Sequence, residues 1–196
     1  MRAEVQFNKV QFADALASYK MLKEKATNVE RRQLAETGIL RCAFLLRDDI
    51  KTIHAATDLL AEAKLSPELR NEALYYRAKA YTKQKADKKA MEDYRELAKD
   101  TRNSYGAEAK YQVAQSLYDA KEYAAAEKEL LNYIEQSTPH AYWLARSFIL
   151  LSDVYHATGK DLDARQYLLS LQQNYQGNDD IESMIESRLS KLKVEN

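Results

Sequence analysis

The sequence predicts an all-α protein built from antiparallel helix pairs that repeat along the chain. Its 196 residues include 28 alanines and 14 tyrosines but only 4 glycines and 2 prolines. This composition favours long helices and leaves few of the turn residues that a sheet protein needs. Small residues also recur in pairs at a fixed spacing inside apolar stripes of helical period. Composition and spacing together therefore predict an array of helical repeats.

The paired small residues indicate where the two helices of each repeat approach most closely. The two members of a pair are twelve residues apart, and equivalent pairs follow one another after 36 and then 38 residues. Larger apolar residues flank them at helical spacing, such as Tyr123, Leu130 and Ile134 around Ala126. The three pairs are Ala78 with Ala90, Ala114 with Ala126, and Ser152 with Ala164.

Capping and turn residues set the expected boundaries of a single array over residues 1–196. Ser66 and Pro67 have the chemistry of a helix start, and Thr138–Pro139 repeats it; Gly159 is expected in a turn. Asp179 and Glu182 have the spacing of a capping box before a final amphipathic helix. The divisions are a partial repeat at 1–28, repeats at about 29–65, 66–103, 104–138 and 139–176, and a capping helix at 179–193.

The least regular repeat is the one at 29–65. Its pattern places Ile39, Cys42 and Leu45 on the inner face of the first helix. The second helix, at about 50–63, is expected to carry Ile50, Ile53, Leu59 and Leu60 on its inner face. At the other end of the chain, the apolar face of the 179–193 helix is expected to cover the last repeat, since an array needs a polar-backed terminal element, and to contribute no binding residues. The first residues read as a repeat entered midway, so we expect the natural N-terminus and any targeting signal to lie upstream.

Composition and motifs argue against several classes of function. The 30 basic and 30 acidic residues balance to a net charge of zero, which does not match a nucleic-acid binder. No apolar run reaches the ~20 residues of a membrane span. His54, His140 and His156 lack metal-ligand spacing, and the single cysteine, Cys42, falls at a packing position. We therefore expect no catalytic residues, no metal and no cofactor.

The three small-residue repeats, with Tyr81, Leu117 and Tyr155 as their following large residues, resemble the tetratricopeptide repeat. The resemblance covers roughly residues 3–175 and implies a right-handed superhelical solenoid. Leu74, Lys110 and Phe148 stand where the family usually has tryptophan. The segment 138–155, followed by the GNDD turn, resembles the C-terminal end of long repeat proteins of the bacterial cell envelope. That narrower resemblance favours the periplasm, with the cytoplasm as the alternative.

Members of this family generally bind peptides or partner proteins on the concave face formed by their first helices. The resemblance therefore implies a non-enzymatic interaction module that presents this groove to a peptide or partner helix. A structural spacer or self-association scaffold inside a larger envelope protein is the alternative, so the chain is expected to be a monomer or to self-associate weakly. The groove positions are Glu72, Tyr75, Lys79 and Lys83 from the second full repeat, Glu108, Tyr111, Gln115, Tyr118 and Asp119 from the third, and Arg146, Asp153 and His156 from the last.

The groove tyrosines Tyr75, Tyr111 and Tyr118 have two interpretations. They are partner anchors if they stay accessible, because tyrosine combines large area with low rotamer entropy. They are ordinary packing residues if the neighbouring repeats cover them. Members that clamp a chaperone tail use lysine and asparagine where this chain has Tyr75 and Tyr111, and Lys79 and Gln115, which argues against that role.

Overall fold

The structure is a computed structural model that describes residues 2–136 and 138–192. This part of the chain forms eleven α-helices and no β-strand. The chain divides into two compact units, Met1–Tyr94 and Arg95–Asn196, and each unit is described by itself. The prediction of an all-α fold made of helix pairs is confirmed, whereas the division into one array stays a prediction.

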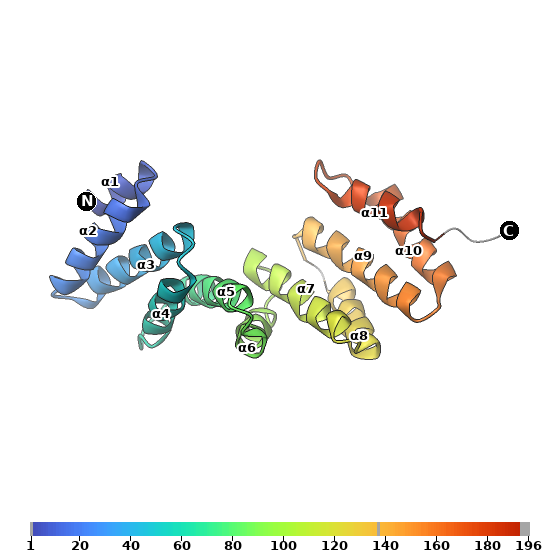
Figure 1. Cartoon of the computed structure of the whole chain (residues 1–196), viewed down its shortest axis with the longest axis horizontal. Helices are drawn as coiled ribbons and strands as arrows, with labels where there is room; N and C mark the ends of the chain where they lie inside the picture. Colours follow the sequence, from blue (N-terminus) through green and yellow to red (C-terminus); the bar gives the residue numbers. More distant parts are fainter. Residues whose placement is uncertain (1, 137, 193–196) are drawn as a thin grey trace. The chain divides into compact units, whose positions relative to one another are not determined.

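In the N-terminal unit each helix packs against the next one in the chain from α1 to α5. The first helices of neighbouring pairs, α3 and α5, also touch, as a stack of pairs requires. The boundary between the two units falls inside α6. The helices, coloured blue to green in Figure 1, are α1 (Arg2–Asn8), α2 (Phe12–Glu24), α3 (Val29–Leu45), α4 (Asp49–Leu60), α5 (Pro67–Lys83) and α6 (Asp87–Leu97).

In the C-terminal unit two full helix pairs are followed by one terminal helix. The first helices α7 and α9 pack side by side, and the terminal helix α11 contacts both helices of the last pair. One apolar core joins all five elements. The helices, coloured light green to red in Figure 1, are α7 (Ser104–Asp119), α8 (Tyr123–Glu135), α9 (Ala141–Ala157), α10 (Asp161–Asn174) and α11 (Ile181–Leu189).

Every first helix ends in the same way, with a residue in the left-handed region. After α3, for example, the N–H of Arg47 donates to the carbonyl of Phe44 and the N–H of Asp48 donates to that of Ala43, both at 3.0 Å. This is a Schellman motif, which satisfies carbonyls that the helix end leaves without partners. The left-handed residues are Val10, Arg47, Lys85, Lys121 and Gly159, with φ of 62°, 57°, 55°, 62° and 78°. They recur every 36 to 38 residues, the period of the small-residue pairs.

The paired small residues are buried at all six positions. In the last pair the hydroxyl of Ser152 donates to the carbonyl of Ala164 at 3.0 Å, so the two helices touch there. A larger side chain at such a contact would force the helices apart. The spacing of twelve residues therefore reports a packing requirement.

In the 29–65 repeat, two of the expected inner residues are wrong. Leu45 and Ile50 are 45% and 63% exposed, whereas Leu40 and Ala43 are buried. Leu45 is the last residue of α3, and Ile50 lies in the first turn of α4. That turn is capped by Asp48, whose carboxylate accepts from the N–H of Lys51 at 3.0 Å. Both expected residues therefore lie at the turn between the two helices, where the side chains stay exposed.

Of the two expected helix starts at a proline, one is confirmed and one is wrong. Ser66 caps α5, with its hydroxyl accepting from the N–H of Leu69 at 3.3 Å. Thr138 does not cap α9, which begins two residues after Pro139. Its hydroxyl accepts from the N–H of His140 at 3.2 Å and donates to the carbonyl of Thr101 at 3.1 Å, so it holds a turn.

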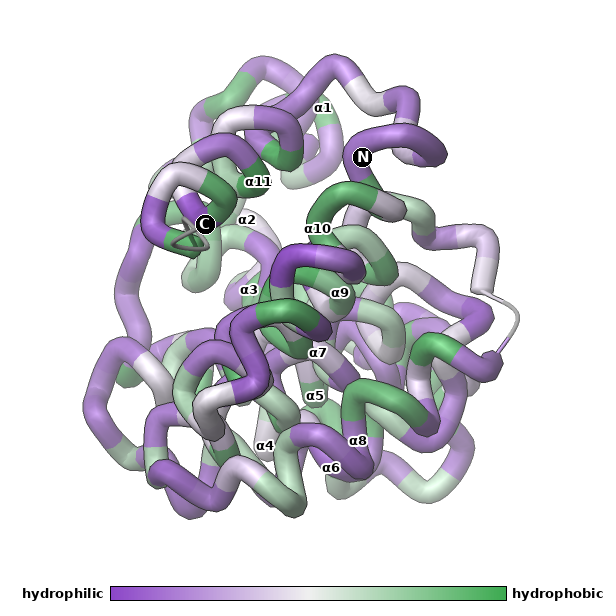
Figure 2. The backbone as a smooth tube through the Cα atoms, turned by 90° about the vertical axis from the view of Figure 1, so that its right-hand side faces the viewer, coloured by the Kyte–Doolittle hydropathy of each residue, from purple (hydrophilic) through white to green (hydrophobic). Residues whose placement is uncertain are grey.

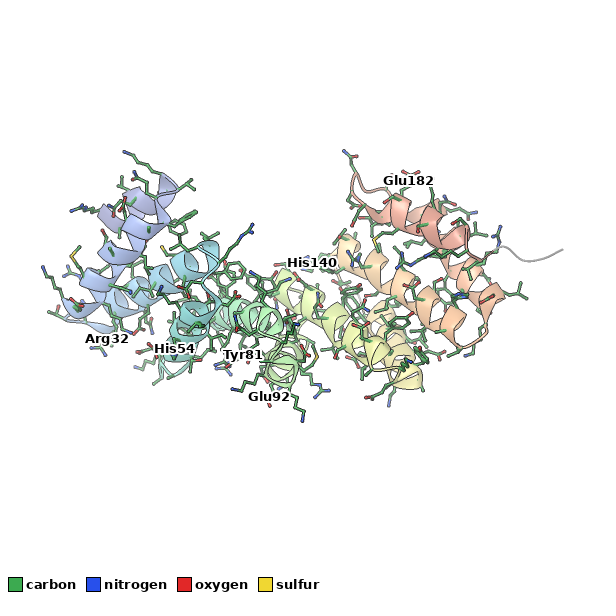
Figure 3. The ribbon with its side chains drawn as sticks, in the orientation of Figure 1. Arg32, His54, Tyr81, Glu92, His140 and Glu182 are labelled. Atoms are coloured by element: carbon green, nitrogen blue, oxygen red, sulfur yellow. The ribbon has the colours of Figure 1, made fainter. Side chains whose placement is uncertain are left out.

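The terminal helix α11 covers the last pair with an apolar face. Ile181, Ile185 and Leu192 are buried, and Glu182 lies on the outer side of the helix (Figure 3). The expected capping box is wrong, because the Asp179 carboxylate accepts from the N–H of Ile181 and from the hydroxyl of Tyr175. The start of α11 is therefore anchored to the segment that follows α10.

Hydrophobic and hydrophilic residues alternate along the helices (Figure 2). Within the described residues, no helix is both long enough and apolar enough to cross a bilayer.

Candidate binding pocket

A chain of side-chain hydrogen bonds runs along the C-terminal half of α7. The hydroxyl of Tyr111 donates to the Oε1 of Gln115 at 2.8 Å, and the Nε2 of Gln115 donates to the Oδ1 of Asp119 at 2.9 Å. Residues four apart lie on one face of a helix, so the three side chains form a ladder. Both ends of the Gln115 amide are engaged, which fixes the direction in which it points.

Arg146 of α9 connects this ladder to the next pair. Its guanidinium lies 5.0 Å from the ring centre of Tyr111 and 5.8 Å from that of Tyr142. It also donates to the hydroxyls of Tyr111 and Tyr142, at 3.1 and 3.0 Å. Trp143 also packs against Tyr111, with ring centres 5.6 Å apart. Tyr111 is therefore buried inside a cluster, where it positions its neighbours.

A second arginine reaches the same face from the terminal helix. The Nε and Nη2 of Arg188 donate to the two carboxylate oxygens of Asp153 at 2.7 and 2.8 Å. Such a bidentate pair is stronger and more directional than a single contact. The Nη1 of Arg188 donates to the carbonyl of Met184 at 3.3 Å, within its own helix. The side chain is thus held from two directions.

Three of the residues described above, Gln115, Asp153 and Arg188, belong to the lining of a pocket of about 450 Å³. Its walls come from α7, α9 and α11 and from the two residues that close the described part of the chain. Tyr118 supplies an aromatic wall, and its ring lies 5.6 Å from that of Tyr123. Burial raises the pKa of Tyr118, and the nearby Asp153 carboxylate raises it further, so this hydroxyl keeps its proton. The lining residues are Gln115, Tyr118, Ser152, Asp153, His156, Arg188, Lys191 and Leu192.

Several solved structures share the fold of this chain. The structure of MamA has a TM-score of 0.69 and 15% identity, with 96% of each chain covered. The C-terminal part of a tetratricopeptide-repeat protein from Cytophaga hutchinsonii has a TM-score of 0.69 and 13% identity, covering 97% of this chain and 76% of that one. YrrB, described as a tetratricopeptide-repeat protein with an unusual peptide-binding site, has a TM-score of 0.67 and 15% identity, covering 96% and 88%.

The chain has the tetratricopeptide-repeat (TPR) fold. No protein-family model matches the sequence, and a search of curated proteins gave no significant match. Three other residues occupy the positions where TPR proteins usually carry tryptophan. Leu74 is buried and Phe148 is half-buried. Lys110 is buried too, and its ammonium contacts Glu129 at 2.8 Å and Asn132 at 3.0 Å.

Four of the predicted groove residues of the C-terminal unit line the pocket: Gln115, Tyr118, Asp153 and His156. The Nδ1 of His156 lies 2.7 Å from the Oδ1 of Asp161. The other four predicted residues of this unit do not line the pocket. Glu108 and Tyr111 are buried, Asp119 is exposed beside Gln115, and Arg146 belongs to the tyrosine cluster.

In the N-terminal unit the predicted groove lysines contact aromatic rings. The ammonium of Lys79 lies 5.3 Å from the ring centre of Tyr75, and that of Lys83 lies 5.9 Å from the ring of Phe44. Lys83 also lies 3.6 Å from the carboxylate of Asp49. Glu72, expected on the groove, is buried and accepts two hydrogen bonds from Arg41 at 2.6 and 2.7 Å.

The pocket residues of the terminal helix were not predicted from the sequence. That segment was expected to cover the last repeat without contributing to a site, but Arg188, Lys191 and Leu192 form one wall of the pocket. The available signal was the pair of basic residues at the end of an amphipathic helix, which local patterns do not connect to Asp153. Within the described residues, no group of three or more His, Cys, Asp and Glu side chains is arranged to hold a metal.

Proposed function

We propose that this chain is a non-enzymatic protein-interaction scaffold whose C-terminal unit receives a segment of a partner protein, a peptide or a helix, in the pocket described above. The observation that supports this function is the lining of that pocket. Four of the groove residues that the TPR resemblance implies on α7 and α9 belong to it: Gln115, Tyr118, Asp153 and His156.

The physical state of the pocket supports binding rather than packing alone. Tyr118 is half-buried and offers a rigid aromatic surface. The Gln115 amide and the Arg188 guanidinium are already held by hydrogen bonds, so a partner would lose little affinity to ordering them. The description of YrrB as peptide-binding supports the view that this fold accommodates such ligands. The envelope compartment and its cytoplasmic alternative stay predictions.

Site-specific photo-crosslinking tests the proposal. Benzoylphenylalanine in place of Tyr118 should give a discrete crosslinked product in a lysate of the source cells, whereas the same residue in place of Leu162, an exposed side chain on α10, should not. Tyr111 is unsuitable as a probe, because its removal would release Arg146 and Gln115. The same crosslinked proteins at both positions, or none at Tyr118, would contradict the proposal.

A second function, self-association, is favoured by the opposite end of the chain. Val5, Val10 and Met21 are exposed on α1, the turn after it and α2. Beside them lies a mostly apolar pocket of about 280 Å³, lined by Arg2, Ala3, Ser18, Met21, Leu22 and Lys25. On monomeric proteins, contiguous apolar patches larger than about 300–600 Å² are uncommon and mark interaction sites.

Sedimentation equilibrium separates this function from the first. If α1 and α2 mediate self-association, the apparent mass should rise with concentration and Met21→Glu should abolish the rise. Leu162→Glu, the same change on the exposed side of α10, should have no effect. A constant monomer mass for the unmodified protein at all concentrations would exclude the self-association function.

A further inference from the structure

The turns that follow α3 and α5 lie side by side in the N-terminal unit. The amide of Gln84 donates to the carboxylate of Asp49 at 3.5 Å, and the ammonium of Lys83 lies 3.6 Å from the same carboxylate. These contacts join the two turns into one surface, here named the turn edge. It comprises residues 45–51 and 83–89, from the last residue of each first helix to the third residue of the helix after it.

The turn edge carries a positive net charge. Its cations are Arg47, Lys51, Lys83, Lys85, Lys88 and Lys89, and its carboxylates are Asp48, Asp49 and Asp87, which gives a net charge of +3. Glu92, on the next turn of α6, is exposed too (Figure 3), and counting it leaves a net charge of +2. The corresponding turns of the C-terminal unit, 119–125 and 157–163, hold two cations and four carboxylates, a net charge of −2. The repeat fold itself therefore does not require basic turns.

Two ion pairs within the turn edge leave four cations and one carboxylate. Asp48 pairs with Lys51, and Asp49 pairs with Lys83. The remaining carboxylate, that of Asp87, lies in the first turn of α6, where the positive end of the helix dipole stabilises it. The remaining cations are all exposed, and they are Arg47, Lys85, Lys88 and Lys89. An anionic partner can therefore reach them from solvent.

Exposed aliphatic side chains lie beside these cations. Leu45 and Leu46 directly precede Arg47, and Ile50 is the most exposed of the three. A nucleic acid would contact the cations through its phosphates and leave the aliphatic groups uncovered. Protein interfaces are usually depleted in lysine. An anionic bilayer matches both features, because its headgroups attract lysine and arginine while the boundary of its acyl chains takes up leucine and isoleucine.

Two of the cations occupy positions where glycine would be more favourable for the backbone. Arg47 and Lys85 have φ of 57° and 55°, in the left-handed region that glycine adopts without steric cost. Strain of this kind persists where the side chain serves a function. Lys121, with φ of 62° at the equivalent stop of the C-terminal unit, has the same strain among acidic neighbours and provides a matched control.

We propose that the turn edge binds the surface of an anionic lipid bilayer, with Arg47, Lys85 and Lys88 against the headgroup phosphates and with Leu46 and Ile50 at the boundary of the acyl chains. This is a peripheral contact made by the N-terminal unit alone. It involves no residue of the pocket in the C-terminal unit and does not depend on the proposed function.

Co-sedimentation of the full chain with vesicles tests the inference. Vesicles of equal parts phosphatidylglycerol and phosphatidylcholine should bind the chain, and vesicles of phosphatidylcholine alone should not. Binding should weaken as salt is added, because ions screen the attraction between exposed cations and headgroups. No binding to the phosphatidylglycerol vesicles, or equal binding to both kinds, would overturn the proposal.

Glycine substitutions separate the contact from a loss of folding. Lys85→Gly removes one cation and relieves the left-handed backbone, so vesicle binding should weaken about fivefold while stability in urea rises. Adding Arg47→Gly should bring the loss to about 25-fold. Lys121→Gly makes the same change in the C-terminal unit and should leave vesicle binding unchanged. Equal losses for Lys85→Gly and Lys121→Gly would show that net charge alone is responsible and would contradict a contact at the turn edge.

Ile50→Ser distinguishes a bilayer from a soluble polyanion. The side chain is 63% exposed, so its removal should leave the helices intact, which a circular dichroism spectrum checks. Vesicle binding should weaken several-fold, because aliphatic carbons no longer reach the acyl boundary. An Ile50→Ser variant that binds vesicles as the parent does would assign the attraction to phosphates alone. That result, or tighter binding of the parent to a DNA duplex than to the vesicles, would overturn the proposal.

Discussion

Gly159, just after α9, allows one free-energy cost to be measured in isolation: that of holding the residue after a helix in the left-handed backbone conformation. Its φ is 78°, and a β-carbon added there would have no atom within 4 Å. Gly159→Ala therefore removes no contact and creates no clash. What changes is the backbone preference: a left-handed conformation costs an L-residue about 1–2 kcal/mol, and alanine recovers roughly 0.5–1 kcal/mol because its unfolded chain is less flexible than glycine's. We expect a net loss of about 1 kcal/mol in the free energy of unfolding.

The assay is urea denaturation followed by circular dichroism at 222 nm, with two companion variants. Gly159→Asn should cost less than Gly159→Ala, because asparagine tolerates the left-handed region better. Lys121→Gly, at the equivalent stop after α7 with φ of 62°, should raise stability by about 0.5–1 kcal/mol. A neutral Gly159→Ala, or a Lys121→Gly variant that is less stable than the parent, would refute the reasoning.

Three further predictions concern the interior of the two units. Ala126→Leu should lower stability by about 1–3 kcal/mol, because Ala126 is fully buried between α8 and its neighbours, whereas Ala124→Leu on the exposed side of the same helix should not; thermal melts compare the two. Asp93→Ala should lower the free energy of unfolding by about 3–5 kcal/mol, measured by urea denaturation, because the half-buried Arg77 guanidinium loses the carboxylate to which it donates at 2.7 and 2.8 Å. An Asp93→Ala variant as stable as the parent would contradict this. Burial raises the pKa of the Cys42 thiol to about 11, so at pH 8 a disulfide reagent should modify it slowly in the folded chain and rapidly in urea, and equal rates would show that the thiol is accessible.

Features of the fold that depend on neighbouring residues were predictable from the sequence. Ser66 before Pro67 starts α5, and Gly159 ends α9, because capping and left-handed turns involve only a few consecutive residues. The close contacts between paired helices were also predictable, since two helices can approach closely only where both carry a small side chain. By contrast, Thr138 before Pro139 has the same local chemistry as Ser66 yet does not cap, because its hydroxyl bonds to Thr101.

The candidate site was only partly predictable for the same reason. The helix period places Gln115 and Tyr118 on one face of α7, so their neighbourhood follows from sequence alone. Which of the tyrosines stays accessible depends on the next repeat, since Arg146 and Trp143 cover Tyr111. The wall from α11 depends on the approach of Arg188 to a residue 35 positions away, and no local pattern records such a contact.

The side-chain bonds between successive repeats determine how this chain responds to tension. In the C-terminal unit, Arg146 with Tyr111, Arg188 with Asp153, and Thr101 with Gln136 are each 35 residues apart, so each bond connects a repeat only to the next one. When the two ends of such a chain are pulled apart, the force acts on these hydrogen bonds one after another along the chain. Each bond that breaks should allow one repeat to unfold and extend. At ~3.5 Å per extended residue, a repeat of about 37 residues frees roughly 130 Å of chain. We therefore expect a chain of this construction to extend in steps of one repeat, which single-molecule pulling would record as evenly spaced rupture events.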